Sequence, residues 1–179
     1  HGMFHVVSVG TTTGYSTQDY LLWPTFLPVF MLLLSGVATS AGSTGGGIKM
    51  VRLLILLQQA RREMRRLAHP RAVQPVRLGK SVVEAPVIFA VLAFMLVYGA
   101  TVIGLSMLLM LTDLDPVTAF SAVLASVNCM GPGLGAVGPA SSFAVLTDFQ
   151  VWVCTLAMLM GRLEMLSFLA LLTPSFWQR

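Results

Sequence analysis

Long apolar stretches, interrupted by short polar breaks, dominate the chain and predict helices of membrane-spanning length. Residues 21–38 form an uninterrupted apolar run, close to the roughly 20 residues needed to cross a bilayer, although it contains Pro24 and Pro28. Residues 85–111 and 149–172 are predicted to form two further spans. The pattern therefore predicts an all-α membrane protein.

Two other apolar segments are too short to span. Residues 116–127 would form a helix of about 18 Å, shorter than the roughly 30 Å of hydrocarbon in a bilayer. Asp115 is a suitable N-cap for that helix, and Pro116 suits its first position. Residues 1–9 read as the end of a comparable helix. A glycine-bearing loop and then a long apolar run follow each segment, the loops being Thr11-Thr12-Thr13-Gly14-Tyr15 and Asn128-Cys129-Met130-Gly131-Pro132-Gly133-Leu134-Gly135.

This repeated order is typical of a cation filter that is built from backbone carbonyls. Gly14 and Gly131 would give the backbone the freedom to direct carbonyls toward an axis. Residues 11–13 are expected to be extended, with hydroxyls that bind neighbouring loops. The negative ends of the two short-helix dipoles would favour a cation at the same location. The sequence therefore predicts a pore built by repetition, with both loops on the same side of the membrane.

A glycine-rich break interrupts the helical pattern after the first long run. Residues 40–47 read Ser-Ala-Gly-Ser-Thr-Gly-Gly-Gly, and apolar helix resumes at Ile48 and continues to about Leu67. A phosphate-binding loop is disfavoured, because Ile48 occupies the position of the motif's lysine and no strand is predicted before the glycines. We interpret the break as a flexible element beside the pore, with a fixed kink as the alternative.

Arg162 and Glu164 are predicted to lie inside the last apolar run, where charged side chains usually face the bundle interior and serve a function. Two positions apart on one helix, they would point about 200° apart and could not pair with each other. Arg162 is expected to face the aqueous path below the filter, where its charge would repel cations. Glu164 would neutralise a basic group elsewhere. A buried structural ion network is the alternative.

Composition and charge support a membrane protein and orient it. Hydrophobic residues make up 56% of the 179 residues and charged residues 10%, whereas about a quarter are charged in soluble domains. Nine of the eleven Lys and Arg residues lie within 49–80, and none lies within 81–161. By the positive-inside rule, residues 49–80 are cytoplasmic and the glycine loops face the outside. The basic cluster is expected to contact anionic lipid or a protein partner, and no nucleic acid.

Four motifs occur in order across nearly the whole chain. They are Thr-Thr-Thr-Gly-Tyr at 11–15, Ala-Gly-Ser-Thr-Gly-Gly-Gly-Ile-Lys at 41–49, Asn-Cys-Met-Gly-Pro-Gly-Leu-Gly at 128–135 and Gly-Arg-Leu-Glu at 161–164. Together they resemble the Trk-type potassium uptake subunits of the TrkH/KtrB superfamily. The resemblance implies four membrane–pore–membrane repeats around a pseudo-fourfold pore. This chain would supply the C-terminal part, which is most of the third repeat and all of the fourth.

The resemblance also implies roles for individual residues. Filter carbonyls would bind K⁺, namely those of Thr11, Thr12, Thr13, Gly14, Asn128, Cys129, Met130 and Gly131. An intramembrane gating loop beside Arg162 would consist of Gly42, Ser43, Thr44, Gly45, Gly46 and Gly47. The subunit would form a homodimer on a cytosolic nucleotide-binding regulatory subunit of the TrkA/KtrA type. Residues 49–80 would be the docking surface for that regulator.

We therefore expect a potassium uptake subunit of the cytoplasmic (inner) membrane, with K⁺ as the transported ion, no organic cofactor and no enzymatic activity. A Na⁺/K⁺-transporting member of the same superfamily and a multi-span permease component are the alternatives. An intramembrane enzyme is disfavoured, because no Ser/His, paired Asp or metal-ligand set is expected at membrane depth. The predicted units are residues 1–58 (filter loop and broken span of the third repeat), 59–83 (basic cytoplasmic segment) and 84–179 (complete fourth repeat).

Overall fold

The computed structural model describes residues 1–40, 42–43, 45–69, 75–79, 81–163, 165–173 and 177. In chain order its elements are α1 (Gly2–Gly10), the 3₁₀ turn η1 (Tyr20–Leu22), α2 (Phe26–Val37), α3 (Met50–Ala68), β1 (Arg77–Leu78), β2 (Ser81–Val82), α4 (Ala85–Met110), α5 (Pro116–Val127), η2 (Gly135–Val137), η3 (Phe143–Val145), α6 (Asp148–Arg162) and α7 (Met165–Leu172). The predicted all-α class is confirmed. The antiparallel β1–β2 hairpin, with Arg77 opposite Val82, was not predicted within the polar connector.

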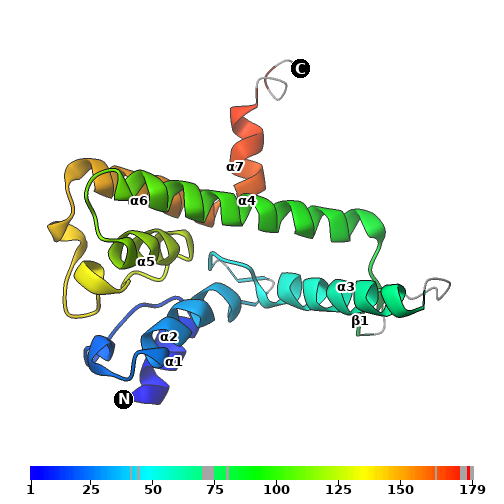
Figure 1. Ribbon diagram of the computed structural model, residues 1–179, viewed down its shortest axis with the longest axis horizontal. Helices are drawn as coiled ribbons and strands as arrows, with labels where there is room; N and C mark the ends of the chain where they lie inside the picture. Colours follow the sequence, from blue (N-terminus) through cyan, green and yellow to red (C-terminus); the bar gives the residue numbers. More distant parts are fainter. Residues whose placement is uncertain are drawn as a thin grey trace.

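The short helix α5 is the centre of the packing. Figure 1 shows α4 as the longest helix, with α6 alongside it and α5 beneath the pair, and α5 contacts α2, α4 and α6. Nine of its 12 residues are buried, and they lie on every side of the helix. A helix that is buried all round needs apolar neighbours in every direction. Side chains from α2, α4, α5 and α6 accordingly form one hydrophobic core.

Local chemistry explains where α5 begins. Asp115 Oδ2 accepts a hydrogen bond from the N–H of Thr118 at 3.0 Å, and Pro116 is the first helical residue. The carboxylate pairs one of the backbone donors that a helix start leaves open, while proline has no donor there. The predicted N-cap and the predicted bounds of this helix are therefore confirmed.

The first long apolar run does not form a helix of spanning length. The chain makes the turn η1 and then α2, which has 12 residues. Pro24 precedes α2, and Pro28 is its third residue, where a missing N–H needs no helical partner. The prediction of one span over residues 21–38 is therefore wrong, because the prolines delay the start of the helix.

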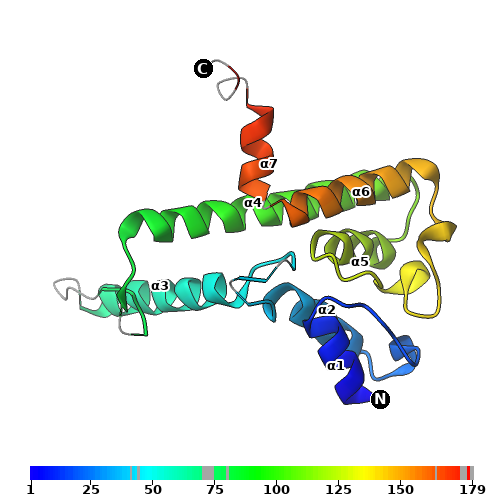
Figure 2. The same cartoon turned by 180° about the vertical axis from the view of Figure 1, so that it is seen from behind.

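The last apolar run is bent. α6 ends at Arg162 and α7 begins at Met165, and the two helices are bent by 107°. Figure 2 shows α7 standing away from α4 and α6. The prediction of one continuous span over residues 149–172 is therefore wrong. Arg162 is the last residue of α6, so the orientation expected for Arg162 and Glu164 on one continuous helix does not apply, and Glu164 lies outside the described residues.

Among the described residues, α4 is long and apolar enough to cross a membrane by itself, and the bent pair α6–α7 gives a second such segment if it counts as one span. α3 runs along the other half of α4, where Ile55, Val76, Ile88 and Val91 form a second small core. The predicted helix over residues 48–67 is confirmed to within two residues.

Gly161 of α6 packs directly on the end of α5, since a Cβ there would collide with the carbonyl of Val127. We expect Gly161→Ala to lower the free energy of unfolding by roughly 1–3 kcal/mol. Gly104→Ala on α4 is the matched control, because no described atom lies within 4 Å of a Cβ at Gly104. Thermal unfolding of the full-length protein in detergent checks this, and equal melting temperatures for the two variants would contradict the close packing of α6 on α5.

Candidate ion-binding site

The loop after α1 begins with a tight helix end of the Schellman type. The N–H of Thr12 donates to the carbonyl of Val9 at 3.0 Å, and the N–H of Thr13 donates to that of Ser8 at 2.8 Å. Thr12 has a φ of 54° and Gly14 a φ of 77°. Because Thr12 is left-handed, the chain leaves the helix sharply and the last helical carbonyls are paired within the turn.

The loop after α5 repeats this backbone geometry position by position. The N–H of Cys129 donates to the carbonyl of Ser126 at 3.0 Å, and the N–H of Met130 donates to that of Ala125 at 2.9 Å. The φ angles are 55° at Cys129 and 103° at Gly131. A left-handed conformation costs a non-glycine residue about 1–2 kcal/mol. Its presence at the same position of both loops therefore indicates a shared structural requirement.

The threonine hydroxyls of the first loop bond locally. Thr11 Oγ1 donates to the carbonyl of Val7 at 2.7 Å and lies 2.8 Å from Thr13 Oγ1. Residues 11–13 were expected to be extended, with hydroxyls bound to neighbouring loops. Both expectations are wrong, because Thr12 is left-handed and its neighbours' hydroxyls turn back on their own helix. The N–H groups of Thr12 and Thr13 also donate to carbonyls of α1, so the carbonyls of the loop are its remaining polar groups.

The two loops lie against each other. A Cβ at Gly14 would collide with the carbonyl of Met130 and would lie 3.2 Å from Cδ of Pro132. Beyond the loops, the hydroxyl of Tyr20 donates to the carbonyl of Gly133 at 3.2 Å. Two segments that are far apart in the sequence therefore form one continuous backbone surface.

The backbone carbonyls of residues 11–14 and 128–131 accept no hydrogen bond from the part of the chain that the structure describes. Buried backbone carbonyls are nearly always paired with protein or water. Asn128 and Met130 are buried, whereas Thr11, Thr13 and Gly131 are exposed and water can reach them. Eight open carbonyls on two adjoining loops form a concentration of partial negative charge. Such oxygens can replace the hydration shell of an alkali cation.

The glycine-rich break contacts both loops through its backbone. A Cβ at Gly45 would lie 3.2 Å from Thr12 Oγ1 in the first loop. A Cβ at Gly46 would collide with the carbonyl of Val127 and would lie 3.1 Å from Cα of Asn128 at the start of the second loop. The predicted gating residues Gly45 and Gly46 are thus adjacent to the predicted filter residues, and the predicted gating residue Thr44 lies outside the described residues.

A cavity of about 110 Å³ adjoins the break. Its lining consists of Ser43, Gly45, Gly46, Gly47, Lys49, Arg52, Phe94, Gly161, Arg162 and Met165. Three of these side chains, from Lys49, Arg52 and Arg162, are cationic. The guanidinium of Arg52 lies 3.9 Å from the centre of the Phe94 ring. The structure brings Arg162 to the break, as the sequence had suggested. The sequence analysis did not place Lys49 and Arg52 at this cavity, because it used their charge only to orient the chain in the membrane. The one signal that could have pointed to the cavity is the closeness of Lys49 to the glycine run.

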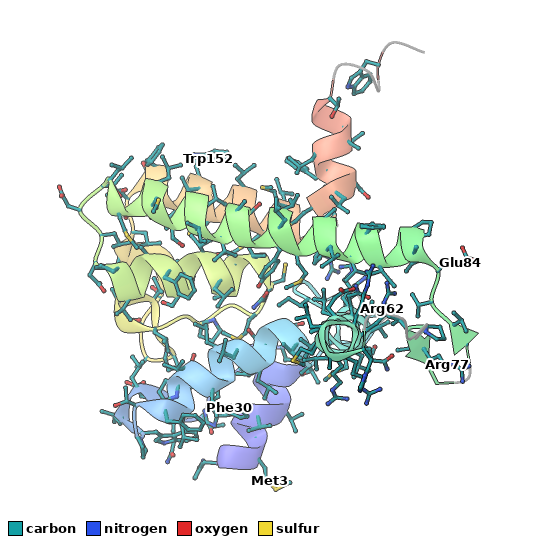
Figure 3. All side chains as sticks on the ribbon, turned by 45° about the vertical axis from the view of Figure 1, so that its right-hand side comes forward. Met3, Phe30, Arg62, Arg77, Glu84 and Trp152 are labelled. Atoms are coloured by element: carbon teal, nitrogen blue, oxygen red, sulfur yellow. The ribbon has the colours of Figure 1, made fainter. Side chains whose placement is uncertain are left out.

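The basic segment forms a second cleft at some distance from the loops. It has a volume of about 230 Å³ and is lined by Gln58, Arg61, Arg62, Arg65, Pro75 and Val76. Glu63 Oε1 lies 3.8 Å from Arg62 Nε, and Glu63 Oε2 lies 4.0 Å from Arg66 Nη1. Figure 3 shows Arg62 on the end-on helix α3 and Arg77 on the hairpin beyond it, on the same side as Glu84. This end of the molecule is suited to contact anionic groups.

Comparisons with known proteins agree on one family. The family model described as "TrkH: Cation transport protein" matches residues 1–178. The "Trk system potassium uptake protein TrkH" of Vibrio parahaemolyticus is 44% identical over 98% of this chain and 36% of its own length. The protein of the same name from Salmonella typhimurium is 41% identical over 98% of this chain and 36% of its own length. The crystal structure of the potassium transporter TrkH from Vibrio parahaemolyticus matches with a TM-score of 0.89, over 98% of this chain and 37% of that one. The chain thus spans little more than a third of the relatives it matches.

The contact between the two loops can be tested at their glycines. Both glycines have a positive φ, so alanine strains the backbone at either one, but only at Gly14 would the Cβ also collide with the other loop. We expect Gly14→Ala to destabilise the full-length protein by about 1–3 kcal/mol more than Gly131→Ala. Thermal unfolding of the two variants measures the difference. Equal losses would mean that the loops do not touch.

Proposed function

Since the chain belongs to the TrkH family of cation transport proteins, we propose that it lines a path by which potassium ions cross the cytoplasmic membrane. The observation that carries the proposal is the cluster of open carbonyls on the two adjoining loops, residues 11–14 and 128–131. The names of the relatives, which are Trk system potassium uptake proteins, support potassium as the ion.

The physical argument is one of hydrogen-bond satisfaction. An open carbonyl costs several kcal/mol in hydrocarbon, so irregular backbone at membrane depth is tolerated where it is buried in protein or lines water. A dehydrated K⁺ satisfies several carbonyls at once, and the carbonyls replace its water. The shared left-handed residues Thr12 and Cys129, followed by Gly14 and Gly131, give both loops the same direction away from their helices. Repetition of one backbone geometry suits a filter in which several loops surround one ion.

We propose that the break acts as a gate. Gly45 and Gly46 contact the two loops, and the adjoining cavity is lined by Lys49, Arg52 and Arg162. Positive charges close to the path raise the energy of a passing cation, the more so where water is excluded. A displacement of the break would move this barrier away from the loops.

The remaining finer proposals concern orientation and assembly. The positive-inside rule supports a cytoplasmic location for the basic segment and an outward location for the two loops. The arginine-lined cleft beside α3 supports a contact with anionic lipid or with a regulatory nucleotide-binding subunit of the TrkA/KtrA type. The homodimer and the pseudo-fourfold set of repeats rest on the resemblance of the motifs.

The transport proposal is tested by uptake. In a strain that cannot grow at limiting K⁺, the full-length protein should restore growth and Rb⁺ uptake. Gly131→Ser should weaken discrimination of K⁺ from Na⁺ by roughly tenfold, or about 1.4 kcal/mol, because a side chain at a φ of 103° shifts the backbone of the loop. Gly99→Ser, where a Cβ has open space among the described residues, is the control. Unchanged growth at limiting K⁺ would discard the function, and identical permeability ratios would discard the filter assignment.

The gate is tested within the glycine run. Gly46→Ala forces the break away from the carbonyl of Val127, whereas no described atom lies within 4 Å of a Cβ at Gly42. We expect Gly46→Ala to raise K⁺ flux into proteoliposomes severalfold and Gly42→Ala to leave it unchanged. Equal flux through the two folded variants would identify the break as a fixed kink.

A further inference from the structure

We propose that the side chain of Asn128 is a positioning residue that sets ion selectivity, because it ties the start of the second loop to α2, α4 and the break. Asn128 was predicted as a ligand through its backbone carbonyl, which leaves the amide side chain without a role. The inference rests on the proposed function, because selectivity has meaning only if the loops conduct ions.

The amide belongs to a chain of buried hydrogen bonds. The hydroxyl of Tyr98 on α4 donates to Asn128 Oδ1 at 3.0 Å, and Asn128 Nδ2 donates to Ser35 Oγ on α2 at 2.9 Å. The Ser35 hydroxyl then donates to the carbonyl of Leu32 at 2.7 Å. Asn128 and Ser35 are 0% exposed and Tyr98 is 8% exposed. Each group donates to the next, so the network is satisfied along its length, and such buried networks define a unique geometry.

Two glycines, one in α2 and one at the end of the break, pack closely on the same amide. A Cβ at Gly36, in the last turn of α2, would lie 3.3 Å from Asn128 Nδ2. A Cβ at Gly47 would lie 2.9 Å from Asn128 Oδ1. The N–H of Ile48, the residue after Gly47, donates to the carbonyl of Gly36 at 2.6 Å, so the end of the break is hydrogen-bonded to α2. The amide of Asn128 is therefore enclosed by α2 on one side and by the end of the break on the other.

Asn128 lies at the junction between α5 and the second loop, so contacts of its side chain affect the backbone of that loop. It is the residue that ends α5, with a φ of −77° and a ψ of −7°, and the left-handed Cys129 follows it directly. Because Ser35, Tyr98 and the two glycines hold the amide in place, they also restrain the backbone of Asn128, and loss of an anchor lets that backbone and the carbonyls of residues 128–131 shift. The network fixes those carbonyls relative to the break. Carbonyl geometry is one of the determinants of cation selectivity.

The experiment removes one hydroxyl at a time. Tyr98→Phe removes the donor to Asn128 Oδ1, and Ser35→Ala removes the acceptor of Asn128 Nδ2, and neither substitution adds bulk. Ser106→Ala is the matched control, because this serine lies on the same helix as Tyr98, is 3% exposed, and its hydroxyl has no partner among the described residues. The readout is the ratio of K⁺ to Na⁺ flux through the full-length protein in proteoliposomes, with thermal unfolding recorded for each variant.

We expect each of Tyr98→Phe and Ser35→Ala to change the flux ratio by roughly threefold or more. The double variant should change it no further than the larger single effect, because both hydroxyls act through one amide. Ser106→Ala should leave the ratio unchanged. A wild-type ratio in both folded variants would overturn the inference while leaving the transport proposal intact. Loss of folded protein in both would also overturn it, since the network would then serve the fold. Absence of K⁺ flux through the wild-type protein would instead refute the proposed function.

Discussion

Backbone carbonyls that accept no hydrogen bond from the described residues are the constraint on which the arrangement of this chain depends. Each short helix is followed by a left-handed residue, Thr12 or Cys129, and the N–H groups of that residue and of the next one donate to helical carbonyls. The turn thereby pairs the last helical carbonyls and leaves the carbonyls of residues 11–14 and 128–131 without a donor among the described residues. At the membrane depth proposed for the loops, hydrocarbon cannot pair these carbonyls, so the loops need an enclosed setting that supplies water or a cation. The burial of α5 on every side and the contact of Gly14 with the carbonyl of Met130 are the means by which the chain provides that setting.

The glycines around this site serve close contact as much as flexibility. Gly46 in the break and Gly161 in α6 approach the same carbonyl, that of Val127, from different elements, and a Cβ at either would collide with it. The glycine run was interpreted from the sequence as a flexible element or a fixed kink. The structure adds a third interpretation of the glycine run, because the absence of a Cβ at Gly46 lets the backbone of the break approach the end of α5. In the same region, Arg162 ends α6, where a cation is favoured by the helix dipole. Under the proposed function, a transported cation and this arginine would both be attracted by negative helix ends.

Local signals made some of this predictable. The start of α5 follows from Asp115 and Pro116 alone, and α4 follows from a long apolar run with no charged residue and no proline beyond its first turn. The bend between α6 and α7 was missed, because Arg162 and Glu164 were taken as charges inside one apolar run and hydropathy does not record direction. The shared geometry of the two loops was only partly visible, since Thr-Thr-Thr-Gly and Asn-Cys-Met-Gly have just the glycine in common. Ser35 is the one polar side chain of α2, and Tyr98 is one of a few in α4. Only tertiary packing brings them to one amide, and no pattern along the chain could have paired them.

The two loops differ in what supports them. The second begins at the end of α5, where Val127 and Asn128 meet the break, α2, α4 and α6 through packed glycines and hydrogen bonds. The first is stabilised mainly by hydrogen bonds to its own helix and meets the break at Gly45, beside Thr12. The first loop also packs on the second, where Gly14 meets the carbonyl of Met130. The break therefore touches a loop that is held by four elements and another that is held by its own helix and by the second loop. Under the proposed function, a displacement of the break would act on both loops at once, and the carbonyls of the second loop, which has more anchors, would keep their geometry better than those of the first.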